Sequence, residues 1–397
     1  MGILIAVRSY KLRANEFRPF FILTINNPFV TSGYAGDEYF CDRKQETKDI
    51  VSLLTNGNNV ALISSRRIGK TDLIRHCFSQ KEIAKNYYCF IIDIYSTLCV
   101  EDFINKLGKS ILETLKPKGK QIYGRFISFI KSLTTGISYD INGTPSWSVG
   151  VGDIKNPTTT LDEIFEYLQN ADKPCLVAID EFQQITKYND GNIEATLRTH
   201  IQYCSNAKFI FSGSQRHLMG NMFTSPNRPF YQSVTIINLP VIEKSKYLEF
   251  CVDNFEKNNK KIDVAVVDKL YDDFEGVTFY LQKVMNILFS WTDSRKKCSM
   301  EMYYDAIDYI IKFTAPVYLD LFTQLPEKQR QVMVAICKEE KAKNITSGDF
   351  VKKYWLLSPS SVSSAVNGLL ERDLITVANG VYTVYDHFFA IWIRSNF

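Results

Sequence analysis

The stretch that decides the fold is ISSRRIGKTDLI, residues 63–74. Gly69, Lys70 and Thr71 directly follow the apolar run NVALIS (59–64), and Leu73 and Ile74 continue as one face of a helix. A strand, a tight loop and a helix in this order bring backbone N–H groups and the positive end of the helix to one point. The stretch therefore predicts a phosphate-binding loop, with an ordinary surface turn as the alternative interpretation.

The residues of this loop have separate expected roles. Lys70 is expected to bridge the β- and γ-phosphates of a nucleotide, and Thr71 to place its hydroxyl on Mg²⁺. Gly69 lets the backbone approach a phosphate closely. The pattern G-x-x-x-x-G-K-[ST] has Gly where this chain has Ser64, which makes the turn of the loop less certain. The residues expected to contact the nucleotide are Ser65, Arg66, Arg67, Ile68, Gly69, Lys70, Thr71 and Asp72.

A second motif is CLVAIDEFQQI (175–185), an apolar run that ends in two acids. A buried strand ending in this way presents its carboxylates at the edge of the sheet where ligands bind in open α/β folds. Asp180 is expected to hold Mg²⁺, and Glu181 to orient and deprotonate the attacking water. The alternative is that Asp180 and Glu181 are two solvated acids at an ordinary strand end. The phosphate-binding loop upstream favours the first interpretation, because the two motifs support each other.

The pattern of the chain predicts an α/β fold from about residue 27 to 240, with a parallel sheet covered by helices in three layers. Between the second and third strands, helical stretches near 100–116 and 121–134 precede an Asn-Gly turn that predicts a β-hairpin insertion at about 135–152. The expected strands are NVALIS (59–64), YYCFIIDIY (87–95), CLVAID (175–180), KFIFSG (208–213) and SVTIINL (233–239).

The flanking regions differ in pattern from this core. Residues 1–26 are expected to be an N-terminal extension, as an extra strand or a segment that the core fold does not need. Strand signals vanish over 241–315, where apolar residues recur at helical spacing and predict a helical lid domain. Residues 316–397 are expected to form a winged helix, because three short helices precede two strands around an Asn-Gly turn.

Composition limits the class of protein. The chain has 397 residues, of which 45% are hydrophobic and 23% charged, as in folded globular proteins. Nine cysteines without a C-x-x-C pair, and four histidines without metal-ligand spacing, favour a reducing cytoplasm over a disulfide or zinc framework. No apolar run reaches about 18 residues, so no membrane span is expected.

Together these residues resemble the P-loop ATPases of the AAA+ and STAND group, in particular the archaeal-type ATPase family, which also occurs in bacteria. The resemblance implies ATP and Mg²⁺ as ligands, a helical lid, a C-terminal winged helix, and a segment from Pro28 to Arg43 near the adenine. Its marks run from about Asn27 to the C-terminus: NPFVTSGYAGDEYFCDR (27–43), SSRRIGKT (64–71), LVAIDEFQQI (176–185), FIFSGSQRHLM (209–219), NRPFY (227–231), LPEKQRQVMVAI (325–336) and DHFFAIWIRS (386–395).

The resemblance also implies roles for residues outside the two motifs. Ser214, preferred to Ser212 because it lies at the strand's end, is expected to sense the γ-phosphate. Arg228 lies where related ATPases place an arginine finger, with a structural ion pair as an equal alternative. Relatives begin a lid helix with Gly-x-Pro, whereas this chain reads Gly276-Val277-Thr278. This puts the adenine contact in doubt, although a helix is still expected there.

The expected function is a Mg²⁺-dependent ATPase that works as a nucleotide-driven switch, with ATP, ADP and an unknown protein as partners. Two alternatives stay open: a nucleotide-gated DNA-binding protein, and a nucleotide-binding scaffold without turnover. DNA is weakly supported, because residues 325–397 hold nine Lys or Arg against seven Asp or Glu. ATP rather than GTP rests on the resemblance, as no N-K-x-D motif is present.

Overall fold

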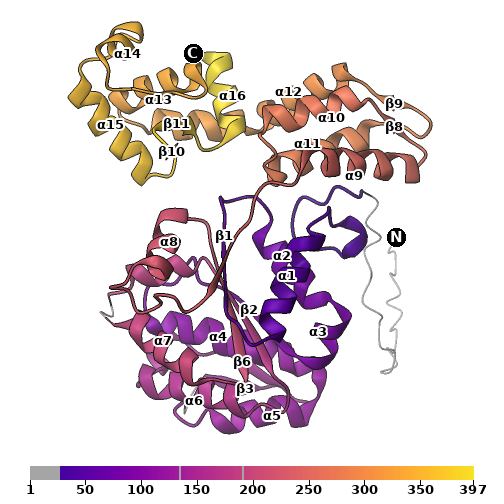
Figure 1. The fold of residues 1–397 in the computed structure, drawn as a ribbon, viewed down its shortest axis with the longest axis vertical. Coiled ribbons are helices and arrows are strands. Elements are labelled where there is room, and N and C mark those ends of the chain that lie inside the picture. Colours follow the sequence, from indigo (N-terminus) through magenta and orange to yellow (C-terminus); the bar gives the residue numbers. More distant parts are fainter. Residues whose placement is uncertain (1–26, 134–135, 190–191) are drawn as a thin grey trace, which may run out of the picture.

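A computed structural model describes residues 27–133, 136–189 and 192–397 (Figure 1). The predicted extension 1–26 lies outside the described residues. The lower part of Figure 1 is an α/β unit, and the lid and the winged helix lie above it. Among the described residues, none of the helices has both the length and the apolar character required to cross a bilayer.

A parallel sheet of five strands forms the centre of the α/β unit, in the order β2-β5-β6-β1-β7. Every residue of β5 is buried, as expected for a central strand with helices on both faces. The predicted strands are all present, with shifts of a few residues at their ends. The strands are β1 (Val60–Ile63), β2 (Tyr88–Asp93), β5 (Cys175–Asp180), β6 (Ala207–Gly213) and β7 (Thr235–Asn238).

Helices cover both faces of this sheet, and each face has its own cluster of buried apolar side chains. The predicted α/β fold with three layers is therefore confirmed. The helices of the unit are α1 (Lys44–Thr55), α2 (Lys70–Ser79), α3 (Lys81–Asn86), α4 (Val100–Leu115), α5 (Lys120–Phe129), α6 (Pro157–Asn170), α7 (Ile193–Tyr203) and α8 (Arg216–Thr224).

The insertion between β2 and β5 contains the expected hairpin. Its strands β3 (Ile137–Tyr139) and β4 (Pro145–Trp147) pair antiparallel across a turn in which Gly143 has a positive φ of 73°. Trp147 is buried, and its indole N–H donates to Asn105 of α4 over 2.7 Å. The start of the predicted insertion, at residue 135, lies outside the described residues.

The lid is mainly helical, but the expectation that it contains no strand was wrong. Two-residue strands β8 (Lys261–Ile262) and β9 (Lys297–Cys298) pair in parallel. A pairing this short has no periodic pattern in the sequence, because it joins two loops that helix packing brings together. The helices are α9 (Lys244–Lys257), α10 (Val264–Asp273), α11 (Thr278–Trp291) and α12 (Met300–Thr323).

The C-terminal part has the predicted three helices and hairpin, followed by a helix α16 that was not predicted. Helix α12 runs across residues 315 and 316, where the domain boundary was expected. Lid and winged helix also share one continuous apolar core, so they pack as a single body. The elements are α13 (Glu327–Glu339), α14 (Gly348–Lys353), α15 (Pro359–Glu371), β10 (Ile375–Ala378), β11 (Val381–Val384) and α16 (His387–Asn396).

Candidate nucleotide-binding site

A cavity of about 380 Å³ lies at the carboxyl end of the sheet. Three parts of the chain line it: the loop 66–72 with Asp180 and Glu181, the segment 30–43 with gaps, and the lid residues Ile242, Thr278, Phe279 and Gln282. Parallel strands end together at one edge, so the loop after β1 and the acids after β5 meet there. The sequence predicted the first two parts of this wall.

The loop departs from the usual glycine pattern without strain at Ser64. Ser64 is fully buried, its hydroxyl donates to the carbonyl of Ser65 over 3.0 Å, and its φ is not positive. The left-handed positions of the loop are instead Arg67, with a φ of 66°, and Gly69, with a φ of 90°. A glycine at position 64 is therefore not needed for the turn, because a Cβ is compatible with this backbone.

Lys70 is held inside the loop. Its side chain is almost completely buried, and Nζ donates to the carbonyl oxygens of Ser65 over 3.0 Å and Ser64 over 3.4 Å. Burial lowers the pKa of Lys70, and the nearby carboxylates of Asp180 and Glu181 act in the opposite direction. A buried cation beside an open cavity is suited to receive an anion.

Thr71 and Asp180 are in direct contact across the cavity floor. The Thr71 hydroxyl donates to Oδ2 of Asp180 over 2.5 Å. A hydroxyl and a carboxylate oxygen side by side are hard oxygen ligands of the kind that Mg²⁺ takes, together with phosphate oxygens. These residues therefore fit the expected metal. Asp72, next to Thr71, lines the same cavity, and burial raises its pKa.

Glu181 follows Asp180 at the end of β5, with a left-handed backbone φ of 56°. Its Oε2 accepts a hydrogen bond from Ser214 over 2.7 Å and one from Gln183 over 2.5 Å. Both donors are buried, so the carboxylate is held in one orientation. Ser214 was predicted near this site as a sensor, whereas Gln183 was missed, although its position two residues after Glu181 is a local signal.

The loop arginines Arg66 and Arg67 line the cavity and also reach the winged helix. Nη1 of Arg66 lies 3.0 Å from Oδ2 of Asp373, and its Nε donates to Oγ of Ser214 over 3.3 Å. Nη1 of Arg67 lies 3.1 Å from Oδ2 of Asp386 at the start of α16. No local pattern in the sequence points to either acid, because both lie about 300 positions downstream.

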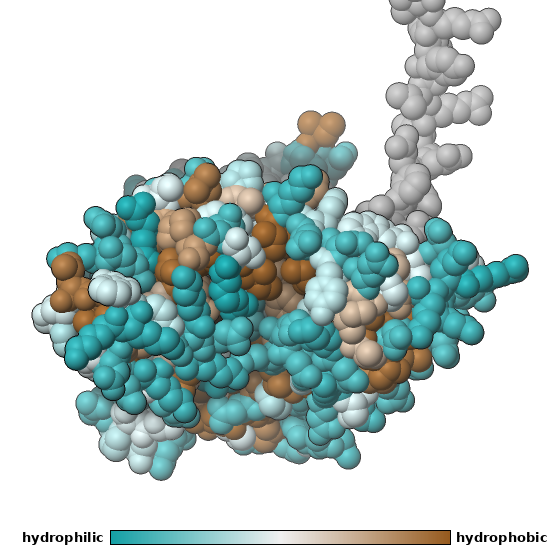
Figure 2. All heavy atoms as spheres, turned by 90° about the horizontal axis from the view of Figure 1, so that it is seen from above, coloured by the Kyte–Doolittle hydropathy of each residue, from teal (hydrophilic) through white to brown (hydrophobic). Residues whose placement is uncertain are grey.

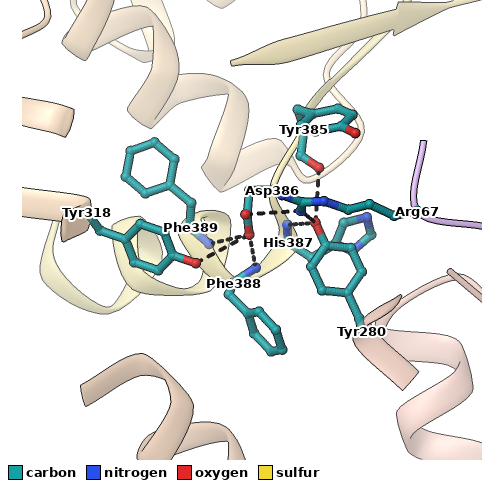
Figure 3. Close-up of polar contacts among 8 residues, drawn as sticks. All are labelled: Arg67, Tyr280, Tyr318, Tyr385, Asp386, His387, Phe388 and Phe389. Atoms are coloured by element: carbon teal, nitrogen blue, oxygen red, sulfur yellow. Dashed lines mark hydrogen bonds and ion pairs between the residues drawn. The ribbon is translucent and has the colours of Figure 1, made fainter. Parts of the chain in front are cut away.

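Figure 3 shows the group around Arg67. Arg67 also donates to the hydroxyl of Tyr280 in the lid over 2.5 Å, and this hydroxyl accepts from the backbone N–H of His387 over 3.2 Å. On the other side, the Tyr318 hydroxyl donates to Oδ1 of Asp386 over 3.4 Å. One arginine of the loop thus joins the α/β unit, the lid and the winged helix.

The lid also contacts the loop through its backbone. The N–H of Phe279 donates to the carbonyl of Arg67 over 3.1 Å, and the Thr278 hydroxyl donates to the carbonyl of Ile68 over 3.3 Å. Helix α11 begins at Thr278, as expected, even though the usual proline is absent. Its first turn therefore lies directly on the phosphate-binding loop.

The segment expected near the base forms one wall of the cavity, with small and aromatic residues between Val30 and Cys41. Phe40 stacks on His76 of α2 with ring centroids 4.2 Å apart, and the Tyr34 hydroxyl lies 3.1 Å from Nδ1 of His76. Opposite, Gln282 is nine-tenths buried and its amide oxygen has no partner within the part of the chain that the structure describes.

Arg228 does not line this cavity. Its Nη2 lies 2.5 Å from Oε2 of Glu194 on α7, and both side chains are partly buried. Burial raises the pKa of Glu194, and Arg228 acts in the opposite direction. The position is that of the structural ion pair, and a finger role stays a prediction that this geometry does not support.

The fold and the site define a P-loop ATPase with a C-terminal winged helix. A family model described as "ATPase domain predominantly from Archaea" matches residues 40–284, more than half of the chain, and the chain therefore belongs to this family. A second model, described as a probable winged helix domain, matches residues 316–395.

Solved structures share this fold over nearly the whole chain. A Walker-type ATPase of Pyrococcus abyssi is 16% identical with a TM-score of 0.64, covering 92% of this chain and 99% of its own. The Aeropyrum pernix Orc1 protein, in complex with DNA, is 11% identical with a TM-score of 0.52, covering 94% and 97%. The Aeropyrum pernix Orc2 protein is 13% identical with a TM-score of 0.52, covering 89% and 94%. No curated protein matches the sequence.

Proposed function

We propose that this protein is a Mg²⁺-dependent ATPase that works as a nucleotide-driven switch. The observation that carries the proposal is the contact between Thr71 and Asp180, with Glu181 beside them, at the floor of a cavity that the loop and the lid enclose. A phosphate-binding loop, two adjacent metal ligands and a carboxylate at the reacting end are what phosphoryl transfer to water requires.

Separate residues of the chain would bind the phosphates and the metal. The backbone of residues 65–72 and the start of α2 would bind the phosphates, and Lys70 would turn from its carbonyl partners toward them. Thr71 and Asp180 would hold Mg²⁺, whose positive charge would stabilise the negative charge of the phosphate groups.

Glu181 is placed to act as the general base. Both of its hydrogen-bond donors, Ser214 and Gln183, reach Oε2, so Oε1 is the oxygen that would take the proton of an attacking water. Ser214 does not itself line the cavity. Its proposed sensing of the γ-phosphate would therefore work through Glu181 and Arg66, which it contacts.

The switch is supported by contacts that bring the lid and the winged helix onto the loop. Phe279 and Asp386 both bind Arg67, so a change in the loop on phosphate binding alters the contacts of both. In this proposal ATP holds the lid and the winged helix closed on the α/β unit, and hydrolysis releases them. The energy of closure comes from contacts made only with the γ-phosphate.

The alternative of gated DNA binding has less support. The Orc1 protein is described in complex with DNA, but helix α15 of this chain has no Lys or Arg within Pro359–Glu371. Phosphate contacts dominate affinity for DNA and need clustered basic residues. A protein partner agrees better with the surface seen in Figure 2, where apolar patches interrupt a hydrophilic face. Among the exposed large apolar side chains are also Phe313 and Val317 of helix α12.

The proposal is tested by measuring phosphate release from ATP with Mg²⁺ and with an excess of chelator, in the wild type and in Thr71→Ala. We expect turnover only with Mg²⁺, and a loss of about 100-fold or more in Thr71→Ala. Binding of ATP without any turnover would favour the scaffold alternative. A salt-dependent affinity for duplex DNA that changes with nucleotide would favour the gated DNA-binding alternative.

A further inference from the structure

We propose that Asp373, in the winged helix, is a positioning residue for ATP hydrolysis on the α/β unit. It acts through Arg66 and Ser214 on Glu181, so that the site is complete only when the winged helix is docked. This inference rests on the proposed ATPase function and names the part of the chain that controls it.

An unbroken series of contacts connects Asp373 to Glu181. Oδ2 of Asp373 binds Nη1 of Arg66 over 3.0 Å, and Nε of the same guanidinium donates to Oγ of Ser214 over 3.3 Å. Ser214 in turn donates to Oε2 of Glu181 over 2.7 Å. Because Arg66 can only donate, Ser214 must use its lone pair toward Arg66 and its proton toward Glu181. The polarity of the series is therefore fixed.

Two aromatic rings also lie near the guanidinium group of Arg66. The rings of Tyr95, after β2, and Tyr385, in the winged helix, each lie 5.9 Å from its guanidinium carbon. Three-quarters of the Arg66 side chain is buried by these contacts. A planar cation that contacts two rings and a carboxylate has little freedom to turn, and Asp373 determines which edge of it faces Ser214.

The position of Asp373 is itself unfavourable for an acid. It follows helix α15, whose C-terminus carries the negative end of the helix dipole, and its backbone φ of 52° is left-handed. Asparagine and glycine suit such a position better than an acid does. A carboxylate here is explained by its cation partner on the loop and not by the stability of the winged helix.

The consequence is that hydrolysis depends on a docked winged helix. If the winged helix leaves the loop, Arg66 loses Asp373 and Tyr385 together, and Ser214 loses the neighbour that fixes its hydroxyl. Glu181 then keeps only Gln183 as a firm donor. Asp373 itself does not line the cavity, so nucleotide binding is preserved while the chemical step slows.

The experiment compares steady-state hydrolysis and the binding of a non-hydrolysable ATP analogue in the full chain carrying Asp373→Asn, Asp373→Glu or Glu371→Gln. Glu371 is an exposed acid two positions away, and its change removes the same charge from the same helix end. We expect kcat to fall about tenfold in Asp373→Asn, to recover in Asp373→Glu and to stay unchanged in Glu371→Gln. Analogue affinity stays within about twofold in all three.

A double-mutant cycle with Ser214→Ala separates positioning from a structural effect. Asp373→Asn should add almost nothing to the loss caused by Ser214→Ala, because both act through the same hydroxyl. Additive losses, or an Asp373→Asn enzyme with wild-type kcat, would overturn the inference while leaving the ATPase intact. Absence of turnover in the wild type would instead overturn the proposed function, and the inference with it.

Discussion

Arg67 and Asp386 lie 319 positions apart in the sequence, and their side chains meet at 3.1 Å. The first belongs to the loop between β1 and α2, and the second is the N-cap of α16. Asp386 accepts from the backbone N–H groups of Phe388 and Phe389 with Oδ1, while Oδ2 faces Arg67. One carboxylate thus starts a helix of the winged helix and fixes it to the phosphate-binding loop.

These two roles of Asp386 can be separated by substitution. Asp386→Ala removes both the cap and the ion pair, and is expected to lower the free energy of unfolding by about 1–2 kcal/mol. Asp386→Asn keeps a good capping side chain and removes only the charge, so about half of that loss is expected. Urea unfolding of both variants measures the difference. Equal losses in the two variants would show that the ion pair with Arg67, and not the cap, carries the effect.

His387 makes the junction of lid and winged helix sensitive to acid. Burial lowers the pKa of His387, and the nearby Glu275 acts in the opposite direction. The unfolded chain therefore takes up this proton more readily than the folded chain, and stability falls as the pH drops below about 6.5. The slope from this one group is at most about 1.4 kcal/mol per pH unit.

The matching measurement is the free energy of unfolding at several pH values between 7.5 and 5 in the wild type and in His387→Gln. Other groups titrate in both proteins, so the difference between the two curves isolates His387. We expect the wild type to lose more stability than the variant over this range. Parallel curves would mean that His387 does not carry the acid sensitivity.

Arg228 is expected to matter for stability more than for turnover. Removing it in Arg228→Met leaves the largely buried carboxylate of Glu194 without its cation, at a cost of about 1–3 kcal/mol. Phosphate release per folded molecule should stay within about twofold of wild type. A fall of a hundredfold or more with unchanged stability would instead support an arginine finger that reaches the site of another copy.

Lys70, in contrast, is expected to matter for ATP binding and not for stability. Its cation is buried within the loop, and burial lowers its pKa, which means that the folded chain holds the charge at a cost. Lys70→Met is therefore expected to leave the free energy of unfolding unchanged or to raise it by about 1 kcal/mol, and to abolish ATP binding. Calorimetric titration measures ATP binding, and thermal unfolding measures the change in stability. Strong ATP binding by the variant would contradict the role given to Lys70.

Much of the fold could be predicted because its signals are local. The buried strand CLVAID coincides with β5, and the alternation of strands and helices is that of the sheet. The placing of Thr71 beside Asp180 also follows from local patterns, because parallel strands must end at the same edge. These contacts depend on topology, which the order of the elements largely determines.

Other contacts could not be predicted because tertiary packing creates them. Nothing near Arg66 or Arg67 in the sequence points to Asp373 or Asp386. Likewise, nothing near Arg228 in the sequence points to Glu194 as its partner. Helix α16 begins within DHFFAIWIRS, where residues 388–393 are all apolar and so show no alternation with polar residues, although only Phe388, Phe389, Trp392 and Ile393 are buried. The sequence pattern alone suggests that Ser64 disturbs the turn of the loop. In the structure the left-handed positions of the loop are Arg67 and Gly69, so position 64 does not require glycine.

The most direct test of the central claim is steady-state phosphate release from ATP with Mg²⁺ in the wild type and in Glu181→Gln, with ATP affinity measured on the same samples. Removing the general base while keeping its hydrogen-bonding shape should lower kcat by about 100-fold or more and leave ATP affinity within about threefold. Equal turnover in the two proteins would contradict the account, because Glu181 would then not be the residue that activates water.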